Sequence, residues 1–488
     1  MSKFQSVLDT YPHYQVDIGI EVHIQLTTKS KIFCASENGP SKYPNQNIDP
    51  ICSGYPGVLP ILNRRVVDYA IMAGLATESI INRRSEFARK HYFYPDLPKG
   101  FQITQDEKPI CTNGTVSIRL ENGDLKKIRL IRIHMEEDAG KNIHAPSSIL
   151  PVLDLNRAGT PLLEIVSHPD IKSTYEARAY LKALHGIVTY LGICTGNMED
   201  GAFRADTNIS VRKKTDPELG TRCELKNINS FKFIGDAIEY EIERHVNMLE
   251  RGETIHRETR LWDTKEQKTI SMRSKEEAAD YRYFPEPDIP PVCIDEPWIE
   301  RMRAQMPELP LQKFERLQRD YHLKADDAEI LVSDRELADY YETAAKKHES
   351  STLISWVLRD LLGYLKEYKI ALGECKVTPE HLSKIVHMLD RGKINARAAK
   401  EVFVAIAQSG EDPEKIVKDK GLEQIEDTAE IEAIIKKIVE TYPDQLAAYR
   451  AGKTKLYGFF FGQAMTELAG RGNPQVIQAV LKKHLEGT

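Results

Sequence analysis

The chain has 488 residues, of which 41% are hydrophobic and 29% charged, with a formal net charge of −6. It has no run of about 18 apolar residues, and residues 1–5 lack a signal-peptide core, so neither a membrane span nor secretion is expected. The seven scattered cysteines favour reduced thiols in the cytoplasm, and the net charge gives no support for nucleic-acid binding.

A chain of this length predicts several domains, about two to four. The sequence pattern of residues 1–295 predicts a mixture of strands and helices, whereas the pattern from about residue 296 onward predicts almost only helix. A proline-dense segment, residues 284–291, marks the change, because helix does not propagate through it. We expect an α+β fold: a β-rich cradle domain with a mixed or antiparallel sheet and flanking helices (1–295), an all-α linker domain (296–405) and a small all-α tail domain (406–488).

Residues 16–26 alternate almost without a break between apolar and polar side chains. This pattern predicts a strand with one buried face. Its other face carries a carboxylate and an imidazole, Glu21 and His23, which point the same way and could share one ligand. An edge strand with a solvated polar face is an equally good interpretation of this stretch alone.

An Asn-Gly pair at residues 122–123 predicts a β-hairpin. Its second arm ends in three consecutive acids, Glu136, Glu137 and Asp138, which repel one another unless a positive charge neutralises them. A hard divalent cation such as Mg²⁺, which prefers oxygen ligands, would do so. A solvated acidic turn is the alternative.

Further polar side chains occur within apolar runs. Glu164 lies in such a run, where an unpaired carboxylate is costly, so it needs a partner and a metal ion would serve. In the strand at residues 204–212 the alternation places Arg204 and Asp206 on one face, and Lys226 repeats the theme. We expect these strands to line a charged basin.

The irregular stretch at residues 89–105 combines basic, aromatic and proline residues. It suits a rigid loop that grips an anionic or planar ligand. A packed surface loop with buried tyrosines is equally consistent.

Near the C-terminus, Gly458 and Gly462 are spaced to share one helix face. Glycine weakens a helix, so the pair suggests close approach by a neighbouring helix or another backbone. Lys453 and Lys455, just before them, would suit phosphate. Tight helix packing with incidental lysines is at least as consistent with the spacing.

Cys34 and Cys52 bracket an early loop and raise the question of zinc. Structural zinc usually has four ligands in two close pairs. Each of these cysteines stands alone in the sequence, so a zinc site is not expected.

Taken together, the chain resembles the B subunits of the tRNA-dependent amidotransferases, the aspartyl/glutamyl-tRNA(Asn/Gln) amidotransferases, over essentially its whole length. Many long motifs in the same order make this resemblance highly specific. They are residues 19–23, 55–60, 92–96, 134–141, 154–157, 159–162, 225–231 and 280–288.

The resemblance implies an ATP- and Mg²⁺-dependent enzyme, a ligase that forms a C–N bond. It would phosphorylate the side-chain carboxylate of misacylated Glu-tRNA(Gln) or Asp-tRNA(Asn). Ammonia released from glutamine by an amidase-type A subunit would then attack the acyl phosphate, and a small C subunit would hold the complex together. The tail is similar to a tRNA-elbow binder, which implies tRNA contacts at Lys453, Lys455, Gly458 and Gly462.

The resemblance also assigns residues. Its metal positions match Glu21, His23, Glu136, Glu137 and Glu164, and we expect the catalytic set to be Glu21, His23, Glu137 and Glu164. His23 is an unusual Mg²⁺ ligand, so Mn²⁺ is a possible substitute. We expect nucleotide or substrate contacts from Lys90, Tyr92, Tyr94, Asp96, Lys99, Arg204, Asp206 and Lys226. Many relatives carry two cysteine pairs in the early loop and bind zinc there, but this chain keeps only Cys34 and Cys52, so no zinc is predicted.

Two other functions stay open beside this one. An ATP-independent metallohydrolase would use the Glu/His cluster to activate water and would turn over without ATP or tRNA. A non-catalytic tRNA-binding scaffold would keep its activity in the complex after Glu137→Ala. Neither accounts for motifs that span the whole chain.

Overall fold

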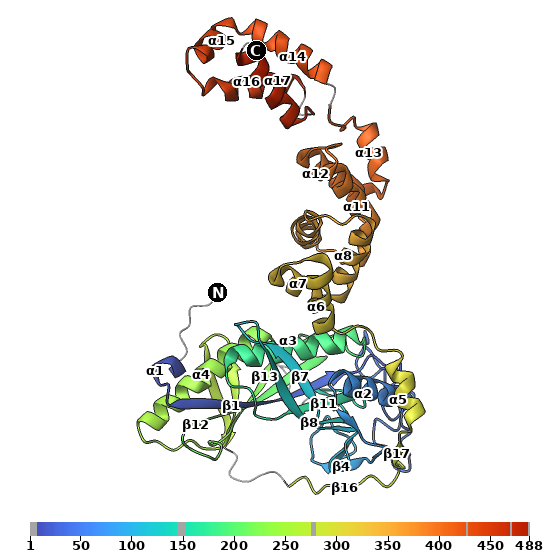
Figure 1. Ribbon diagram of the computed structural model, residues 1–488. Coiled ribbons are helices and arrows are strands. Elements are labelled where there is room, and N and C mark those ends of the chain that lie inside the picture. The colour runs from blue at the N-terminus through green and yellow to red at the C-terminus, as the bar shows by residue number, and fades with distance from the viewer. Residues whose placement is uncertain (1–6, 144–151, 275–279, 426–427, 469–470, 487–488) are drawn as a thin grey trace. The chain divides into compact units, whose positions relative to one another are not determined.

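The computed structural model describes residues 7–143, 152–274, 280–425, 428–468 and 471–486 (Figure 1). The N-terminal residues on which the expectation of no signal peptide depends lie outside these ranges. Contacts divide the chain into two compact units, residues 1–313 and 314–488. The boundaries predicted at residues 295 and 405 stay predictions.

The first unit is built on a large sheet, ten-stranded in the described part of the chain, with the order β15-β14-β13-β12-β1-β11-β8-β6-β2 and β7 paired to β8. All pairs are antiparallel except β13 with β14, so the predicted mixed sheet and the α+β class are confirmed. The strands are β1 (Tyr14–Gln25), β2 (Ile80–Ile81), β6 (Cys111–Thr112), β7 (Thr115–Arg119), β8 (Leu125–Glu137), β11 (Pro161–Ser167), β12 (Phe203–Lys213), β13 (Cys223–Ile228), β14 (Glu258–Asp263) and β15 (Lys268–Ser274).

Small strand pairs and helices complete this unit. The remaining strands are β3 (Arg84–Ser85), β4 (Ala88–His91), β5 (Phe101–Thr104), β9 (Lys141–Ile143), β10 (Val152–Asp154), β16 (Phe284–Pro285) and β17 (Val292–Cys293). The helices are α1 (Val7–Thr10), α2 (Arg64–Ala76), α3 (Thr174–Tyr190), α4 (Phe231–Glu250), α5 (Glu296–Arg303) and α6 (Pro310–Tyr321), whose C-terminal part lies in the second unit.

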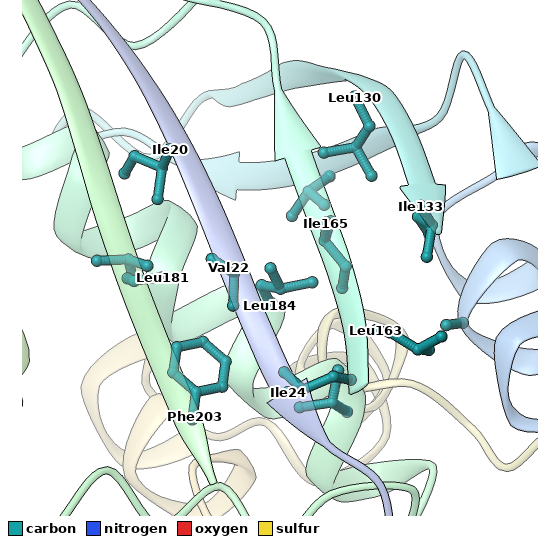
Figure 2. Close-up of a cluster of buried hydrophobic side chains, with 14 of the residues drawn as sticks. Ile20, Val22, Ile24, Leu130, Ile133, Leu163, Ile165, Leu181, Leu184 and Phe203 are labelled. Atoms are coloured by element: carbon teal, nitrogen blue, oxygen red, sulfur yellow. The ribbon is translucent and has the colours of Figure 1, made fainter. Parts of the chain in front are cut away.

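The core of the first unit lies between one face of the sheet and helices α2, α3 and α4. Alternation along β1 buries its apolar side chains completely or nearly so, as predicted. The hairpin predicted at residues 122–123 is confirmed, because β7 and β8 pair across it. Figure 2 shows apolar side chains of four adjacent strands and α3 in this core: Ile20, Val22, Ile24, Leu130, Ile133, Leu163, Ile165, Leu181, Leu184 and Phe203.

The second unit is built from helices joined by loops in its described residues, with one isolated β-bridge between Ile425 and Gly472, and it holds two hydrophobic clusters, one at residues 314–417 and one at residues 431–485. Among the described residues, no helix combines the length and apolar character that crossing a membrane requires. The elements are α7 (Ala325–Val332), α8 (Arg335–Lys347), α9 (Leu353–Ser355), a π-helix (Trp356–Leu361), α10 (Leu362–Tyr368), a 3₁₀ turn (Leu372–Glu374), α11 (Pro379–Asp390), α12 (Ala396–Ser409), α13 (Pro413–Asp419), α14 (Thr428–Thr441), α15 (Pro443–Arg450), α16 (Leu456–Glu467) and α17 (Pro474–Glu486).

Candidate functional site

Register aligns polar side chains in a row across four strands of the large sheet. His23 on β1 lies opposite Arg204 on β12 and opposite Glu164 on β11. Glu164 in turn lies opposite His134 on β8. Directly opposed residues of antiparallel strands project to the same face. The face of the sheet that does not pack on the core therefore carries a continuous polar row.

The centre of this row is a cluster of two carboxylates and two imidazoles. His23 Nε2 lies 3.1 Å from Glu164 and 3.5 Å from Glu136, and the three ligand atoms all lie within 4.8 Å of one another. His134 Nε2 lies 3.3 Å from Glu164 and 3.6 Å from Glu136. Glu136 joins the cluster because it is two residues beyond His134 on the same face of β8.

Charges in the cluster are strongly coupled. Burial alone would lower the pKa of His23, but Glu164 and Glu136 raise it to about 9. Burial alone would raise the pKa of Glu164, but the two histidines lower it well below its ordinary value. The positive charge of the His23 imidazole thus helps to neutralise carboxylates that would otherwise be costly to bury.

Glu21 and Glu137, the other two predicted metal ligands, are not part of the group formed by His23, Glu136 and Glu164. Glu21 accepts a hydrogen bond from Asn208 at 2.8 Å, and burial, then Glu164 and Asp206, raise its pKa. Glu137 points away from Glu136, as adjacent residues of a strand do, and pairs with Lys99 while accepting from the Ile103 N–H at 2.9 Å. The assignment of Glu21 and Glu137 as metal ligands stays a prediction.

A cavity of about 530 Å³ opens over the cluster. Two of the predicted metal ligands, His23 on β1 and Glu136 on β8, line this cavity. Five of the predicted cofactor contacts line it as well. Those five are Lys90, Tyr92, Arg204, Asp206 and Lys226. The other three are not part of this lining: Lys99 lies along a smaller cavity of about 120 Å³, Tyr94 is exposed, and the Asp96 carbonyl accepts from Gly140 at 2.8 Å.

Basic side chains of the cavity are held by acids. Lys226 Nζ lies 2.8 Å from Asp206 and 3.0 Å from Glu224, and these acids raise its pKa against the effect of burial. Burial opposes the charge of Lys90 as well, but Glu136 raises its pKa. Both lysines therefore present cations to the cavity at neutral pH.

Sequence reasoning named Asp138 only as one of three consecutive acids that a cation would neutralise, and it did not assign His134 to the site. Asp138 accepts from Arg204 at 2.9 Å and from Gln25 at 3.0 Å, and it lines the cavity. The alternation along β8 could have revealed His134, since it shares a face with Glu136. Sequence alone did not reveal the contacts of Asp138, because its partners come from two other strands.

The predicted tRNA contacts lie in the second unit. Lys453 and Lys455 are exposed and border a hollow of about 640 Å³ just before α16. Beyond its chain neighbours and the adjoining backbone of its own helix, a Cβ placed on Gly458 or Gly462 would meet no described atom within 4 Å. The alternative of tight helix packing within the chain is therefore wrong at these glycines, and this helix face is open.

Two family models match the chain, one in each of its two compact units. Residues 16–300 match the family model of the GatB/GatE catalytic domain, and residues 339–485 match that of the GatB domain. The chain is 50% identical over 97% of its length to the B subunit of the aspartyl/glutamyl-tRNA(Asn/Gln) amidotransferase of Syntrophotalea carbinolica, covering 99% of that protein. The corresponding B subunit of a Geobacter species is 51% identical over 97% of this chain and is itself covered completely, 100%.

Proposed function

Because the chain belongs to the family of aspartyl/glutamyl-tRNA(Asn/Gln) amidotransferase B subunits, we propose that it uses ATP to phosphorylate the side-chain carboxylate of misacylated Glu-tRNA(Gln) or Asp-tRNA(Asn). Amidation of the acyl phosphate by ammonia then gives Gln-tRNA(Gln) or Asn-tRNA(Asn). The ammonia comes from an amidase-type A subunit, and a small C subunit joins the complex. We place the protein in the cytoplasm, in keeping with its seven free cysteines.

The observation that carries this proposal is the polar row beneath the cavity. Three predicted ligands, His23, Glu136 and Glu164, already lie within 4.8 Å of one another. Mg²⁺ favours carboxylate oxygens, and a single imidazole is compatible with Mn²⁺. The donor set therefore fits a divalent ion, with Glu21 and Glu137 as further candidate ligands.

When bound, such an ion supplies charge neutralisation for the phosphates of ATP. The side chains of this chain contribute the rest. Lys90, Lys226 and Arg204 line the cavity as cations and orient phosphate and carboxylate oxygens. Tyr92 offers an aromatic wall beside them. Phosphorylation replaces a poor leaving group, oxide, by a good one before ammonia attacks.

The decisive experiment measures ATP hydrolysis by the chain co-purified with its A and C partners, with and without misacylated tRNA. Glu164→Gln keeps the shape of the cluster but removes a charge, and Glu137→Ala tests the acid beside it. We expect hydrolysis to need misacylated tRNA and both variants to lose at least about 100-fold, since charge stabilisation is the main contribution to such a transfer. Glu266→Gln, in an exposed turn, is the matched control and should leave the rate unchanged.

Two results would contradict the proposal. Hydrolysis that is absent from the wild-type complex, or equal in wild type and Glu137→Ala, would make the acids structural and favour a tRNA-binding scaffold. Turnover of substrate without ATP or tRNA would favour a metallohydrolase.

A second proposal concerns the tail, residues 406–488, which we infer binds tRNA. It is supported by the open glycine face of α16 and by the exposed lysines that precede it. Glycines allow a phosphate backbone to approach a helix closely, and lysines supply the charge. The tail then adds affinity and specificity for tRNA rather than chemistry.

A further inference from the structure

Two cysteines that the proposed function does not use lie together in the loops that follow β1. The Sγ atoms of Cys34 and Cys52 and a carboxylate oxygen of Asp49 all lie within 4.8 Å of one another, and both cysteines are buried. Lys31 is 0% exposed, and its Nζ contacts Cys52 Sγ at 3.6 Å. Nζ also donates to the backbone oxygen of Asn47. A buried ammonium has thus been placed against a thiol.

Several hydrogen-bond donors contact the sulfur of Cys52, which also lies 3.5 Å from the carbonyl oxygen of Asp49. The sulfur accepts from the Asp49 N–H at 3.2 Å, from the Cys34 thiol and from Lys31. The hydrogen bond from Cys34, together with the amide and Lys31, lowers the pKa of Cys52 to about 6, whereas the same bond raises the pKa of Cys34. The Lys31 ammonium and the Asp49 N–H both contact the Cys52 sulfur, so these groups favour Cys52 as the thiolate of the pair, and the thiolate is the form that reacts.

Lys31 also bears on the prediction that this cluster holds no zinc. The described residues offer three ligands here, one fewer than structural zinc uses, and the Asp49 carboxylate already accepts from the amides of Ile51 and Cys52. The ammonium of Lys31 supplies the positive charge that a thiolate needs. A buried cation that contacts no carboxylate among the described residues is itself stabilised by that thiolate.

We propose that Cys52 and Cys34 are a peroxide-reactive dithiol that closes to a disulfide. The Cys52 thiolate attacks one oxygen of hydrogen peroxide, the O–O bond breaks, and the hydroxide released takes a proton from solvent. The sulfur of Cys34 then attacks the Cys52 sulfenic acid, forming the S–S bond as the S–O bond breaks. The hydroxyl group leaves as water with the Cys34 proton. In total, two thiols and one peroxide give one disulfide and two waters.

The pair is placed so that its oxidation reaches the cavity. A Cβ on Gly159 would lie 3.2 Å from Cys52 Cβ, so the dithiol packs directly on the turn at Gly159. The N–H of Gly159 donates to the carbonyl of Asp138 at 2.9 Å, and Asp138 lines the cavity. Closing a disulfide brings the sulfurs to about 2.05 Å. Closure therefore changes the packing of Cys52 on this turn, and the chemistry itself does not depend on the proposed function.

The test treats the purified full-length chain with hydrogen peroxide at pH 7, blocks the remaining thiols and analyses tryptic peptides by mass spectrometry. Cleavage after Lys31, Lys42 and Arg64 separates the two cysteines. We expect the peptide of residues 32–42 joined to that of residues 43–64, with the loss of two hydrogens. In Cys34→Ser, which lacks the second thiol, dimedone should label Cys52 as its sulfenic acid.

Lys31→Met should slow disulfide formation at least about fivefold, because the thiolate loses its cation. In this variant trypsin no longer cleaves after residue 31, so the peptide that contains Cys34 begins at residue 30. Lys29→Met removes the same charge from an exposed neighbour and should react as wild type. The proposal is overturned if exposed Cys293 is oxidised while Cys34 and Cys52 stay free. It is also overturned if Cys34→Ser gives no dimedone adduct on Cys52, if both lysine variants react alike, or if the purified chain holds one zinc ion that blocks both thiols.

Discussion

His134 lies deeper in the acidic cluster than His23 and contacts the same carboxylates. Its side chain is 3% exposed, against 21% for His23. Arg132 Nε lies 3.2 Å from His134 Nδ1 and donates to it when the ring is neutral, which leaves the proton on Nε2 to face Glu164. A hydrogen bond from a residue behind a metal ligand, such as the one from His134 to Glu164, orients that ligand and tunes its basicity. We therefore infer that His134 positions Glu164.

Replacing His134 by Phe, which fills the space but donates no hydrogen bond, should weaken divalent-ion binding by about 10- to 100-fold, the usual effect of losing such a partner. His134→Gln keeps a donor and should retain most of the affinity. Mn²⁺ binding by the purified chain, followed by electron paramagnetic resonance, separates this effect from catalysis. Equal affinities for wild type and His134→Phe would show that His134 only fills space.

Glu241 is a fully buried carboxylate in a different network, with Arg244 at 2.8 Å and Arg260 at 3.1 Å. Burial would raise its pKa, but hydrogen bonds from His245 and Arg244 lower it to about 2. A carboxyl group whose pKa falls on folding stabilises the folded state above its ordinary pKa. That stabilisation is lost as the pH falls from about 4.5 toward about 2.

Glu241→Gln should therefore lower the free energy of unfolding at pH 7 by about 3 kcal/mol, because it leaves two half-buried arginines short of a partner. The deficit should shrink when unfolding is measured below pH 4, because Glu241 of the unfolded wild-type chain becomes protonated there while the folded chain keeps its carboxylate ionised down to about pH 2. Urea unfolding at pH 7 and pH 3, followed by circular dichroism, measures both values. A deficit that is the same at both pH values would rule out this origin.

At the scale of the element, alternation predicted β1 and its two faces correctly, because a period of two needs only local sequence. It did not predict that β11 lies between β1 and β8, which is what brings Glu164 against both His23 and His134. The order of strands in a sheet depends on long-range pairing rather than on local pattern. The same limit explains why the pairing of Glu137 with Lys99 was not foreseen.

Helix α2 packs on the sheet through a residue without a side chain. A Cβ on Gly74 would lie 2.5 Å from Cys111 Sγ of β6, which is shorter than any real contact. Gly74→Ala should destabilise the first unit by about 1–3 kcal/mol through overpacking. Gly363→Ala, in α10, meets no described atom within 4 Å and should be neutral or stabilising by about 0.5–1 kcal/mol. Thermal unfolding of both variants gives the comparison, and loss of stability in both would contradict the packing argument.

At the scale of the whole molecule, acid clusters and open helix faces belong to different parts of the chain. The first unit holds the cavity and its carboxylates, whereas the hydrophobic cluster at residues 431–485 supports α16 with its exposed lysines and glycines. The separation predicts that binding and chemistry can be altered independently. A substitution in the tail should change the affinity for tRNA and leave the rate at saturating tRNA intact.

Lys453→Glu combined with Lys455→Glu tests this separation in the complete complex. If each lysine contacts one phosphate, the slope of log affinity against log salt should fall by about 0.7–0.9 per contact, and affinity should drop most at low salt. ATP hydrolysis at saturating tRNA should keep its wild-type rate, because no tail residue lines the cavity among those described. The matched control is Lys346→Glu with Lys347→Glu, an exposed pair on α8 with the same charge change. If the control pair weakens binding equally, the effect is one of net charge, and if the tail pair changes only the rate, the tail takes part in chemistry.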